Sequence, residues 1–238
     1  MCKVKPYYYV KLEIYFQNMT PSFNLLSISQ KKFLENLWKM SYFCKKYTMK
    51  NLIIIAHPNK NSFCYNGIMK TIRETLKKNK EDIYVLDLYG ENITLEFVKE
   101  KIKEYKELIT WSERIYIISP VWWFRCTPAL ESFFDQIFTP GFAYNFKPIT
   151  KVYGIPQPLL GDKKVRTYLT HGAPALPVML LYLNSVKLRL VLGVYSFVFG
   201  WFKTKTTQFW SVPFVSHEKR VEYLEKVKDD IRKDLKIK

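Results

Sequence analysis

Residues 51–62 have the sequence NLIIIAHPNKNS, and this stretch decides the fold of the chain. Its apolar run, Leu52–Ile55, shows no polar alternation, which is typical of a strand buried on both faces in a parallel α/β sheet. The run ends before His57, a polar loop follows, and an amphipathic helical pattern begins at Ser62. A helix N-terminus after such a strand offers backbone N–H groups and the positive end of the helix dipole. The stretch therefore predicts a site for a phosphate-bearing ligand at residues 59–63.

From Met49 onward, strand and helix patterns alternate regularly. Strands are expected at 50–56, 83–88, 114–119, 165–170 and 203–212, and helices at 63–79, 95–109, 128–138 and from the N-cap Ser216 onward. The polar residues Asn184, Lys187 and Arg189 interrupt the apolar segment 176–202. Its longest uninterrupted apolar stretch is therefore too short to span a membrane. We expect a buried helix followed by a strand there. The whole pattern predicts an α/β fold with a doubly wound, five-stranded parallel sheet, helices on both faces and ligands at the carboxyl strand ends.

Residues 1–48 do not continue this alternation, and we expect an N-terminal extension before a domain at 49–238. The extension, either an appendage or an over-extended start, has a weak strand pattern to Phe16, a break near Pro21 and a helical pattern over 29–43. It lacks the compact apolar core and small-residue cleavage site of a secretory signal, so a cytoplasmic location is expected.

The net charge of +17 favours attraction to anions such as nucleotides, nucleic acid or an acidic membrane surface. Dispersed lysines on solvated faces are the simpler interpretation, and without a stacking-plus-basic motif nucleic-acid binding is not expected. The four cysteines (Cys2, Cys44, Cys64 and Cys126) show no C-x-x-C spacing and no companion His cluster, so no metal site is expected. Cys64 and Cys126 follow strand ends and are either redox-reactive thiols at helix N-termini or, more simply, small hydrophobic residues.

Three loops follow strand ends and are expected to meet at one edge of the sheet. They are His57–Phe63, Pro120–Thr127 with the sequence PVWWFRCT, and Thr170–Pro174 with the sequence THGAP. Exposed tryptophans at 122 and 123 are costly unless they stack on a planar ligand, and the alternative is that they cover the sheet edge. In the third loop, Gly172 and Ala173 allow a ligand to approach the backbone closely.

Taken together, these strings resemble a known family. Their order and spacing are similar to those of strings in the flavodoxin-like NAD(P)H:quinone oxidoreductases. The strings are AHPN and SF within 56–63, SPVWWF at 119–124 and TPGFAYNF at 139–146. That family includes mammalian quinone reductase, the bacterial drug-activity modulators and the ancillary oxidoreductases of potassium-efflux systems. The resemblance covers residues 49–235 and implies a flavodoxin-like fold.

The resemblance also implies a non-covalent FAD or FMN, NAD(P)H as co-substrate, a quinone or similar small-molecule acceptor, and a homodimer. Hydride would pass from NAD(P)H through the flavin to the acceptor in a two-electron, ping-pong reaction. The implied flavin-binding residues are His57, Ser62, Phe63, Cys64, Val121, Trp122, Trp123, Phe124, Thr170, His171, Gly172 and Ala173. Tyr144 and Phe146, on the loop after the third helix, match the family's aromatic lid over the nicotinamide and quinone.

The chain departs from the family pattern at several positions. Cys64 stands where many relatives have asparagine, and residues 124–127 are one residue longer than the usual turn. Residues 176–183 hold only Tyr182 where members close to the mammalian enzyme carry a Tyr and a His, so the catalytic residues stay unknown. His171 stands where threonine is common, and it either donates to the flavin or is an ordinary polar loop residue.

Four further polar residues are weaker candidates for the site. Arg125 either meets a cofactor phosphate or caps the next helix. His217 is expected to be exposed in the first turn of the last helix, and Glu131 and Asp135 to form an exposed face. The alternative function is a regulatory or binding subunit of a membrane transporter, with little or no catalysis and with residues 1–48 as the membrane or transporter contact. A one-electron flavodoxin shuttle is disfavoured because such carriers are usually acidic.

Overall fold

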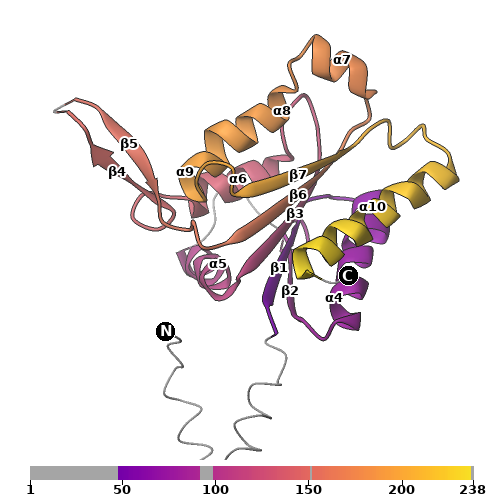
Figure 1. Cartoon of the computed structure of the whole chain (residues 1–238), viewed down its shortest axis with the longest axis horizontal. Coiled ribbons are helices and arrows are strands. Elements are labelled where there is room, and N and C mark those ends of the chain that lie inside the picture. The colour runs from indigo at the N-terminus through magenta and orange to yellow at the C-terminus, as the bar shows by residue number, and fades with distance from the viewer. Residues whose placement is uncertain (1–47, 92–98, 151, 237–238) are drawn as a thin grey trace, which may run out of the picture. The chain divides into compact units, whose positions relative to one another are not determined.

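The computed structural model describes residues 48–91, 99–150 and 152–236 (Figure 1). Its strands are β1 (Lys50–Ile55), β2 (Asp82–Asp87), β3 (Arg114–Pro120), β4 (Tyr144–Pro148), β5 (Gly154–Pro158), β6 (Lys164–Thr170) and β7 (Thr204–Phe209). Its α-helices are α4 (Lys70–Lys78), α5 (Lys99–Trp111), α6 (Pro128–Ile137), α7 (Ala175–Leu180), α8 (Ser185–Leu188), α9 (Ser196–Val198) and α10 (His217–Leu235). Two π-helical segments, η1 (Phe63–Met69) and η2 (Arg189–Tyr195), run directly into α4 and α9.

The main sheet has the strand order β2-β1-β3-β6-β7, and every neighbouring pair is parallel. These are the five strands expected from the sequence, so the predicted doubly wound, five-stranded parallel sheet is confirmed. In β1, Leu52 lies opposite Tyr84 of β2 and Ile115 of β3. Strand β1 is therefore an interior strand of the sheet with neighbours on both sides, in agreement with the burial that its uninterrupted apolar run predicts.

Alternate residues of β1 pack against opposite helical layers. Leu52 and Ile54 belong to one core cluster, together with buried side chains of α5, α6, α8 and η2. Ile53 and Ile55 belong to a second cluster, formed with η1, α4 and α10. All four side chains are fully buried, which is why this strand tolerates no polar alternation.

Strands β4 and β5, which follow α6 and precede β6 in the chain, form an antiparallel hairpin. This hairpin was not expected from the sequence. Its strands, YNFKP and GIPQP, contain prolines and no clear alternation, which normally argues against a strand. Two strands forming their own small sheet tolerate proline because each has a free edge. Tyr144 and Phe146 therefore lie on strand β4, and their expected place on a loop was wrong.

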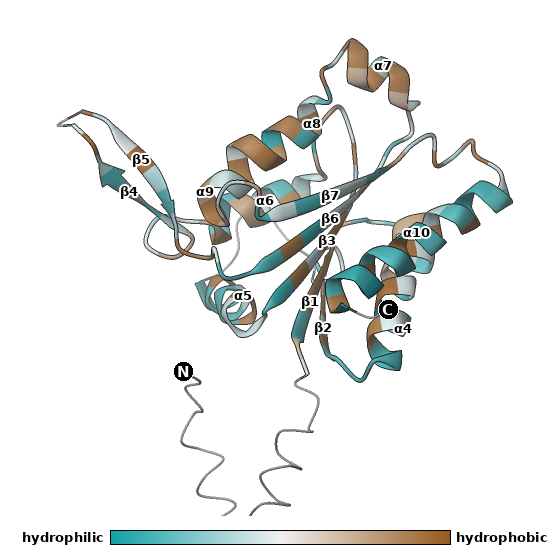
Figure 2. Cartoon of the chain, viewed as in Figure 1, coloured by the Kyte–Doolittle hydropathy of each residue, from teal (hydrophilic) through white to brown (hydrophobic). Residues whose placement is uncertain are grey.

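The expectation of a buried helix within residues 176–202 was only partly right. The segment is helical, but it breaks at Leu183 and Asn184, which both have a left-handed φ of 50°. Before the break, α7 is exposed and apolar, with Leu181 just after it at 76% exposure (Figure 2). After the break, Val186 and Leu190 are fully buried against the sheet. None of the helices in the described ranges is long and apolar enough to cross a membrane.

The termini of the elements agree with the local sequence signals. Ser216 caps α10 as expected, because its Oγ accepts a hydrogen bond from the N–H of Lys219. The expected helix at 95–109 is represented by α5, and its first residues lie outside the described part of the chain. The same holds for the features expected in residues 1–47, so the boundary near Met49 stays a prediction.

Candidate functional site

The three expected loops leave the carboxyl ends of β1, β3 and β6, which are neighbours in the sheet. We call them loop 1 (His57–Ser62), loop 2 (Val121–Thr127) and loop 3 (Thr170–Pro174). The strand order reverses between β1 and β3, so the chain leaves these two strands toward opposite faces of the sheet. In open α/β sheets, ligands bind in the crevice outside the carboxyl ends at such a point.

Loop 1 is held in shape by its own polar side chains. His57 Nδ1 accepts a hydrogen bond from the N–H of Asn59 at 3.0 Å, and Asn59 Oδ1 accepts one from the N–H of Asn61 at 2.8 Å. Ser62 then caps η1, with its Oγ 3.4 Å from the N–H of Tyr65. Burial lowers the pKa of His57, so its ring is neutral at pH 7 and Nδ1 is free to accept. The loop thus delivers the start of a helix to the edge, where first-turn N–H groups lack intrahelical partners.

A charged cluster beside loop 1 was missed by the sequence analysis. Lys60 forms an ion pair with Asp87, the last residue of β2, and its Nζ lies 3.1 Å from the hydroxyl of Tyr65. The Tyr65 hydroxyl donates to the same carboxylate. Lys60 is therefore neutralised by the protein, and the anion site would depend on backbone N–H groups and Ser62. Only the pairing of β2 with β1 brings Asp87 here, so no local motif could have revealed it.

Loop 2 contains a tight turn with its two aromatic residues at the tip. Trp122 and Arg125 exchange two backbone hydrogen bonds of 2.9 and 3.0 Å. Between them, Trp123 and Phe124 have φ values of 49° and 59°, a left-handed conformation that bulky residues rarely adopt. The turn leaves Trp123 91% exposed at the edge, while Arg125 is also exposed and stays a candidate for a phosphate contact.

The far end of loop 2 is fixed by Glu131, which was wrongly expected on an exposed face. Its Oε1 accepts a hydrogen bond from the N–H of Cys126 at 3.0 Å, and its carboxylate pairs with Arg189 of η2. Thr127 Oγ1 donates to the carbonyl of Ala56 at 3.2 Å, which ties the same end to β1. Glu131 is thus a structural support of the loop.

Direct contacts join the three loops to one another. Val121 N–H donates to the carbonyl of Thr170 at 2.9 Å, which links loop 2 to loop 3. Cys64 Sγ lies 3.4 Å from Thr170 Oγ1, which links the helix after loop 1 to loop 3. The rings of His57 and Trp122 meet edge to face, with centroids 6.3 Å apart. The loops therefore form one connected surface.

Loop 3 leaves open space where a ligand could approach. Gly172 and Ala173 are exposed, and the loop is fastened by a hydrogen bond of 3.0 Å from Ser211 N–H to the carbonyl of Ala173. A Cβ built on Gly172 would meet nothing within 4 Å. The chain itself therefore gives no reason for glycine at this position. Space of this kind beside an exposed indole fits a flat ligand whose edge bonds to backbone groups.

His171 does not point to that space. Its side chain is 3% exposed and stacks on Trp210, with ring centroids 4.1 Å apart. Its Nε2 lies 2.9 Å from Nε2 of Gln208. Burial lowers the pKa of His171 to about 4, so the ring is neutral at pH 7. Neither of the two expected roles describes this packed residue. Gln208 lies near the end of β7 and Trp210 just after it, and no local motif marked either as a partner of His171.

Both cysteines of the described chain are buried. Burial raises the pKa of Cys64 to about 11 and that of Cys126 to about 12. The simpler interpretation, small hydrophobic residues, is confirmed for them. His217 is exposed at the start of α10, also as expected.

Tyr144 and Phe146 are not brought to the three loops within one chain. Helix α6 begins after loop 2 and runs back along the sheet, so the hairpin that follows it lies toward the opposite edge (Figure 1). There Tyr144 and Phe146 contact Phe197 of α9, with ring centroids 5.9 and 6.4 Å apart.

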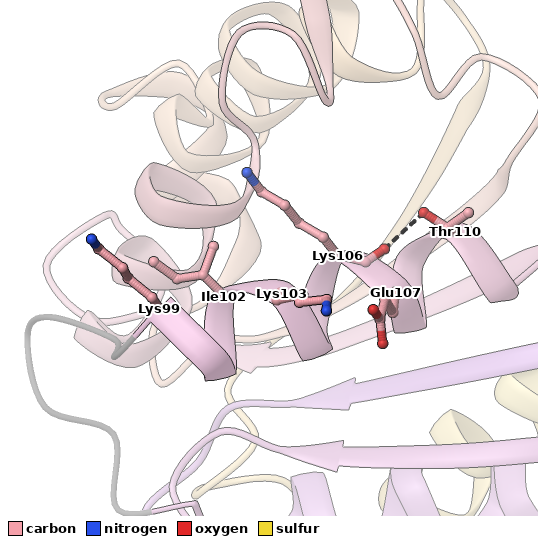
Figure 3. Close-up of a pocket in the computed structure, with 6 residues that line it drawn as sticks. All are labelled: Lys99, Ile102, Lys103, Lys106, Glu107 and Thr110. Atoms are coloured by element: carbon pink, nitrogen blue, oxygen red, sulfur yellow. Dashed lines mark hydrogen bonds between the residues drawn. The ribbon is translucent and has the colours of Figure 1, made fainter.

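An open hollow of about 390 Å³ lies along α5, away from the three loops (Figure 3). It is lined by Lys99, Ile102, Lys103, Lys106, Glu107 and Thr110, all on this helix. None of the expected site residues is among them, and we assign it no role. Within the described ranges, no three His, Cys, Asp or Glu residues are grouped to hold a metal ion.

Comparison with known proteins places these features in context. A family model described as a flavodoxin-like fold matches residues 49–233. An uncharacterized NAD(P)H oxidoreductase of Haemophilus influenzae is 25% identical over 137 residues, which are 52% of this chain and 65% of that protein. The uncharacterized NAD(P)H oxidoreductase YdeQ of Bacillus subtilis is 30% identical over 101 residues, 41% of this chain and 46% of that protein. Each match thus spans less than two thirds of the relative's length.

Three solved structures share the fold. Smu.1420 from Streptococcus mutans has a TM-score of 0.67 at 25% identity, covering 78% of this chain and 100% of the other. An NAD(P)H:quinone oxidoreductase from Methanothermobacter marburgensis has a TM-score of 0.64 at 20% identity, covering 78% and 98%. An FMN-dependent NADH-azoreductase from Bacillus anthracis, solved with FMN, has a TM-score of 0.58 at 15% identity, covering 78% and 97%. The last two likenesses concern the fold alone.

Proposed function

The chain belongs to the family of the flavodoxin-like fold, and from this premise we propose that it is a flavin-dependent NAD(P)H oxidoreductase. Hydride would pass from NAD(P)H through a bound FAD or FMN to a quinone-like acceptor, in two separate half-reactions. The curated relatives carry the name NAD(P)H oxidoreductase, and similar folds include a quinone oxidoreductase and an FMN-dependent azoreductase. These names support the reaction class and a small-molecule acceptor.

The observation that carries the proposal is the convergence of the three loops at the β1/β3 edge. Loop 1 supplies a helix start capped by Ser62, loop 2 an exposed indole at Trp123, and loop 3 an open backbone at Gly172. A flavin needs the same three things: phosphate anchoring, a surface for its ring and hydrogen bonds to the ring's polar edge. The residues present therefore fit such a cofactor.

The roles of the site residues follow from their positions. His57, Ser62 and Phe63 would hold the phosphate region, with Cys64 packed behind them as an apolar residue. The segment Val121–Phe124 would line the ring. Within Thr170 to Ala173, the backbone N–H groups of Gly172 and Ala173 would face the ring's polar edge, since the His171 side chain is buried and its N–H bonds to Phe209. When bound, the flavin supplies the hydride and electron chemistry, and the protein supplies position and donors.

Tyr144 and Phe146 can act as a lid only if they come from a second copy of the chain. They lie toward the other edge of the sheet in their own chain, but Phe146 is 56% exposed and free to contact another molecule. A homodimer is therefore part of the proposal, and the lid would close over the nicotinamide and acceptor from across the interface.

The absorbance spectrum of the purified full chain is the first test. We expect flavin bands, release of FAD or FMN on denaturation, and NAD(P)H oxidation that depends on added quinone. Trp123→Ala should weaken flavin binding about tenfold, as loss of a stacking contact worth about 1.5 kcal/mol predicts. Val221→Ala, which changes an exposed apolar residue of α10, is the matched control. Colourless protein that cannot be reconstituted with either flavin would refute the proposal.

A further inference from the structure

A hydrogen-bonded group lies directly behind loop 3. Gln208 and Asn184 exchange two amide hydrogen bonds, each 2.9 Å long. Gln208 Nε2 also lies 2.9 Å from His171 Nε2. The His171 ring stacks on Trp210, and the His171 N–H donates a 2.8 Å hydrogen bond to the carbonyl of Phe209 at the end of β7. We call His171, Gln208 and Asn184 the amide relay.

The chemistry of the amide relay fixes the protonation of His171. In the orientation that the structure gives Gln208, its Nε2 donates to His171 Nε2, so the neutral ring carries its proton on Nδ1. The second N–H of Gln208 is used by Asn184 Oδ1. Protonation of Nε2 would set two donors against each other inside a buried cluster. Burial keeps the ring neutral at pH 7, which suits the relay in this orientation.

The relay also reaches loop 2 through the break after α7. Asn184 closes that break with a 2.9 Å bond from its N–H to the carbonyl of Val178. Two residues earlier, the ring of Tyr182 stacks on Phe124 of loop 2, with centroids 4.2 Å apart. A continuous set of contacts thus runs from loop 3 through Gln208 and Asn184 to loop 2.

We propose that Gln208 is a positioning residue of the flavin site, which holds loops 2 and 3 at their working separation through His171 and Asn184. This inference rests on the proposed function. Gln208 touches neither loop tip, so its effect reaches the flavin only through the relay. Its substitution should change flavin affinity and the flavin reduction potential, because loop 3 faces the ring's polar edge.

The first test titrates flavin into the Gln208→Leu variant of the full chain. Leucine keeps the bulk of the side chain and removes its hydrogen bonds, and we expect the Kd for FMN and for FAD to rise about tenfold. The matched control is Thr206→Val, on the same strand and face. The Thr206 hydroxyl is buried without a hydrogen-bond partner within the described part of the chain, so its loss should leave the Kd unchanged.

The second test uses Gln208→Glu and a readout that a merely structural role would not move. A carboxylate beside His171 favours the imidazolium, so the NMR titration of His171 should move upward toward neutral pH. Flavin affinity should then vary with pH in step with that titration, whereas the wild-type affinity stays flat from pH 8 to about pH 6. If Gln208→Leu does not fold, this variant decides alone.

The outcomes separate the inference from the proposed function. Wild-type flavin affinity and potential in both Gln208 variants would overturn the inference and leave the proposed function standing. An equal loss in Thr206→Val would also overturn it, because the effect would then be general to β7. Wild-type protein that binds neither FMN nor FAD would overturn both.

Discussion

At the scale of single residues, burial decides which groups can react. A thiol pKa of about 11 or 12 leaves Cys64 and Cys126 almost entirely protonated at pH 8. We therefore expect both to react with iodoacetamide at least about a hundredfold more slowly in the native protein than in the unfolded chain. Peptide mass spectrometry of each site over time measures this. Rapid native labelling of Cys64 would show that the helix after loop 1 opens.

The burial of His171 predicts how the free energy of unfolding depends on pH. Burial lowers its pKa from 6.5 to about 4, so the unfolded chain binds a proton more readily than the folded one. Its stabilising contribution is complete above pH 6.5 and is lost as the pH falls toward 4. This linkage is worth about 3 kcal/mol in the free energy of unfolding.

Urea unfolding at pH 7 and at pH 4 tests that value. The loss of stability on acidification should be smaller by about 3 kcal/mol in His171→Asn than in the wild type. His217→Asn, which removes an exposed histidine, is the matched control. Parallel losses in wild type and His171→Asn would contradict the prediction.

At the scale of secondary-structure elements, α10 is fastened to the sheet by a buried ion-pair network. Arg166 of β6 contacts Asp234 at 2.6 and 2.8 Å and Asp230 at 3.2 Å. Asp234→Ala should cost about 3–5 kcal/mol, because it leaves a buried guanidinium short of its partner. Asp229→Ala, which breaks the exposed pair with Arg232, should cost less than about 1 kcal/mol. Denaturant unfolding of the two variants compares them directly, and equal costs would contradict this account.

Some secondary-structure elements and site residues could be predicted from the sequence, and others could not. The run Leu52–Ile55 predicted its strand because full burial on both faces leaves no choice of residue type. The strings at 56–63, 119–124 and 139–146 together predicted the family, which the match over residues 49–233 confirms. The hairpin was missed because its prolines argue against strands. Asp87 and Gln208 were missed because their partners are set by strand pairing, which no local pattern encodes.

At the scale of the whole molecule, two regions each expose several large apolar side chains. One is α7 with the residues after it, where Leu176, Leu180, Leu181 and Leu183 are 66–76% exposed. The other is the hairpin, where Phe146 is 56% and Val152 96% exposed. Patches of this kind mark interaction sites. If the hairpin of each copy covers α7 of the other, a two-fold axis closes the contact and buries both regions at once.

Charged substitutions in the exposed residues at the end of α7 test this arrangement. Leu180→Lys combined with Leu181→Lys places two charges in the proposed interface without touching the buried core, and should convert the proposed homodimer into a folded monomer. Light scattering after gel filtration measures the mass, and flavin absorbance reports whether the edge loops survive. Because the lid would come from the partner, quinone-dependent NAD(P)H oxidation should fall while flavin stays bound. Val221→Lys on exposed α10 is the control that keeps the dimer. A wild-type monomer with full activity would mean that Tyr144 and Phe146 take no part in catalysis.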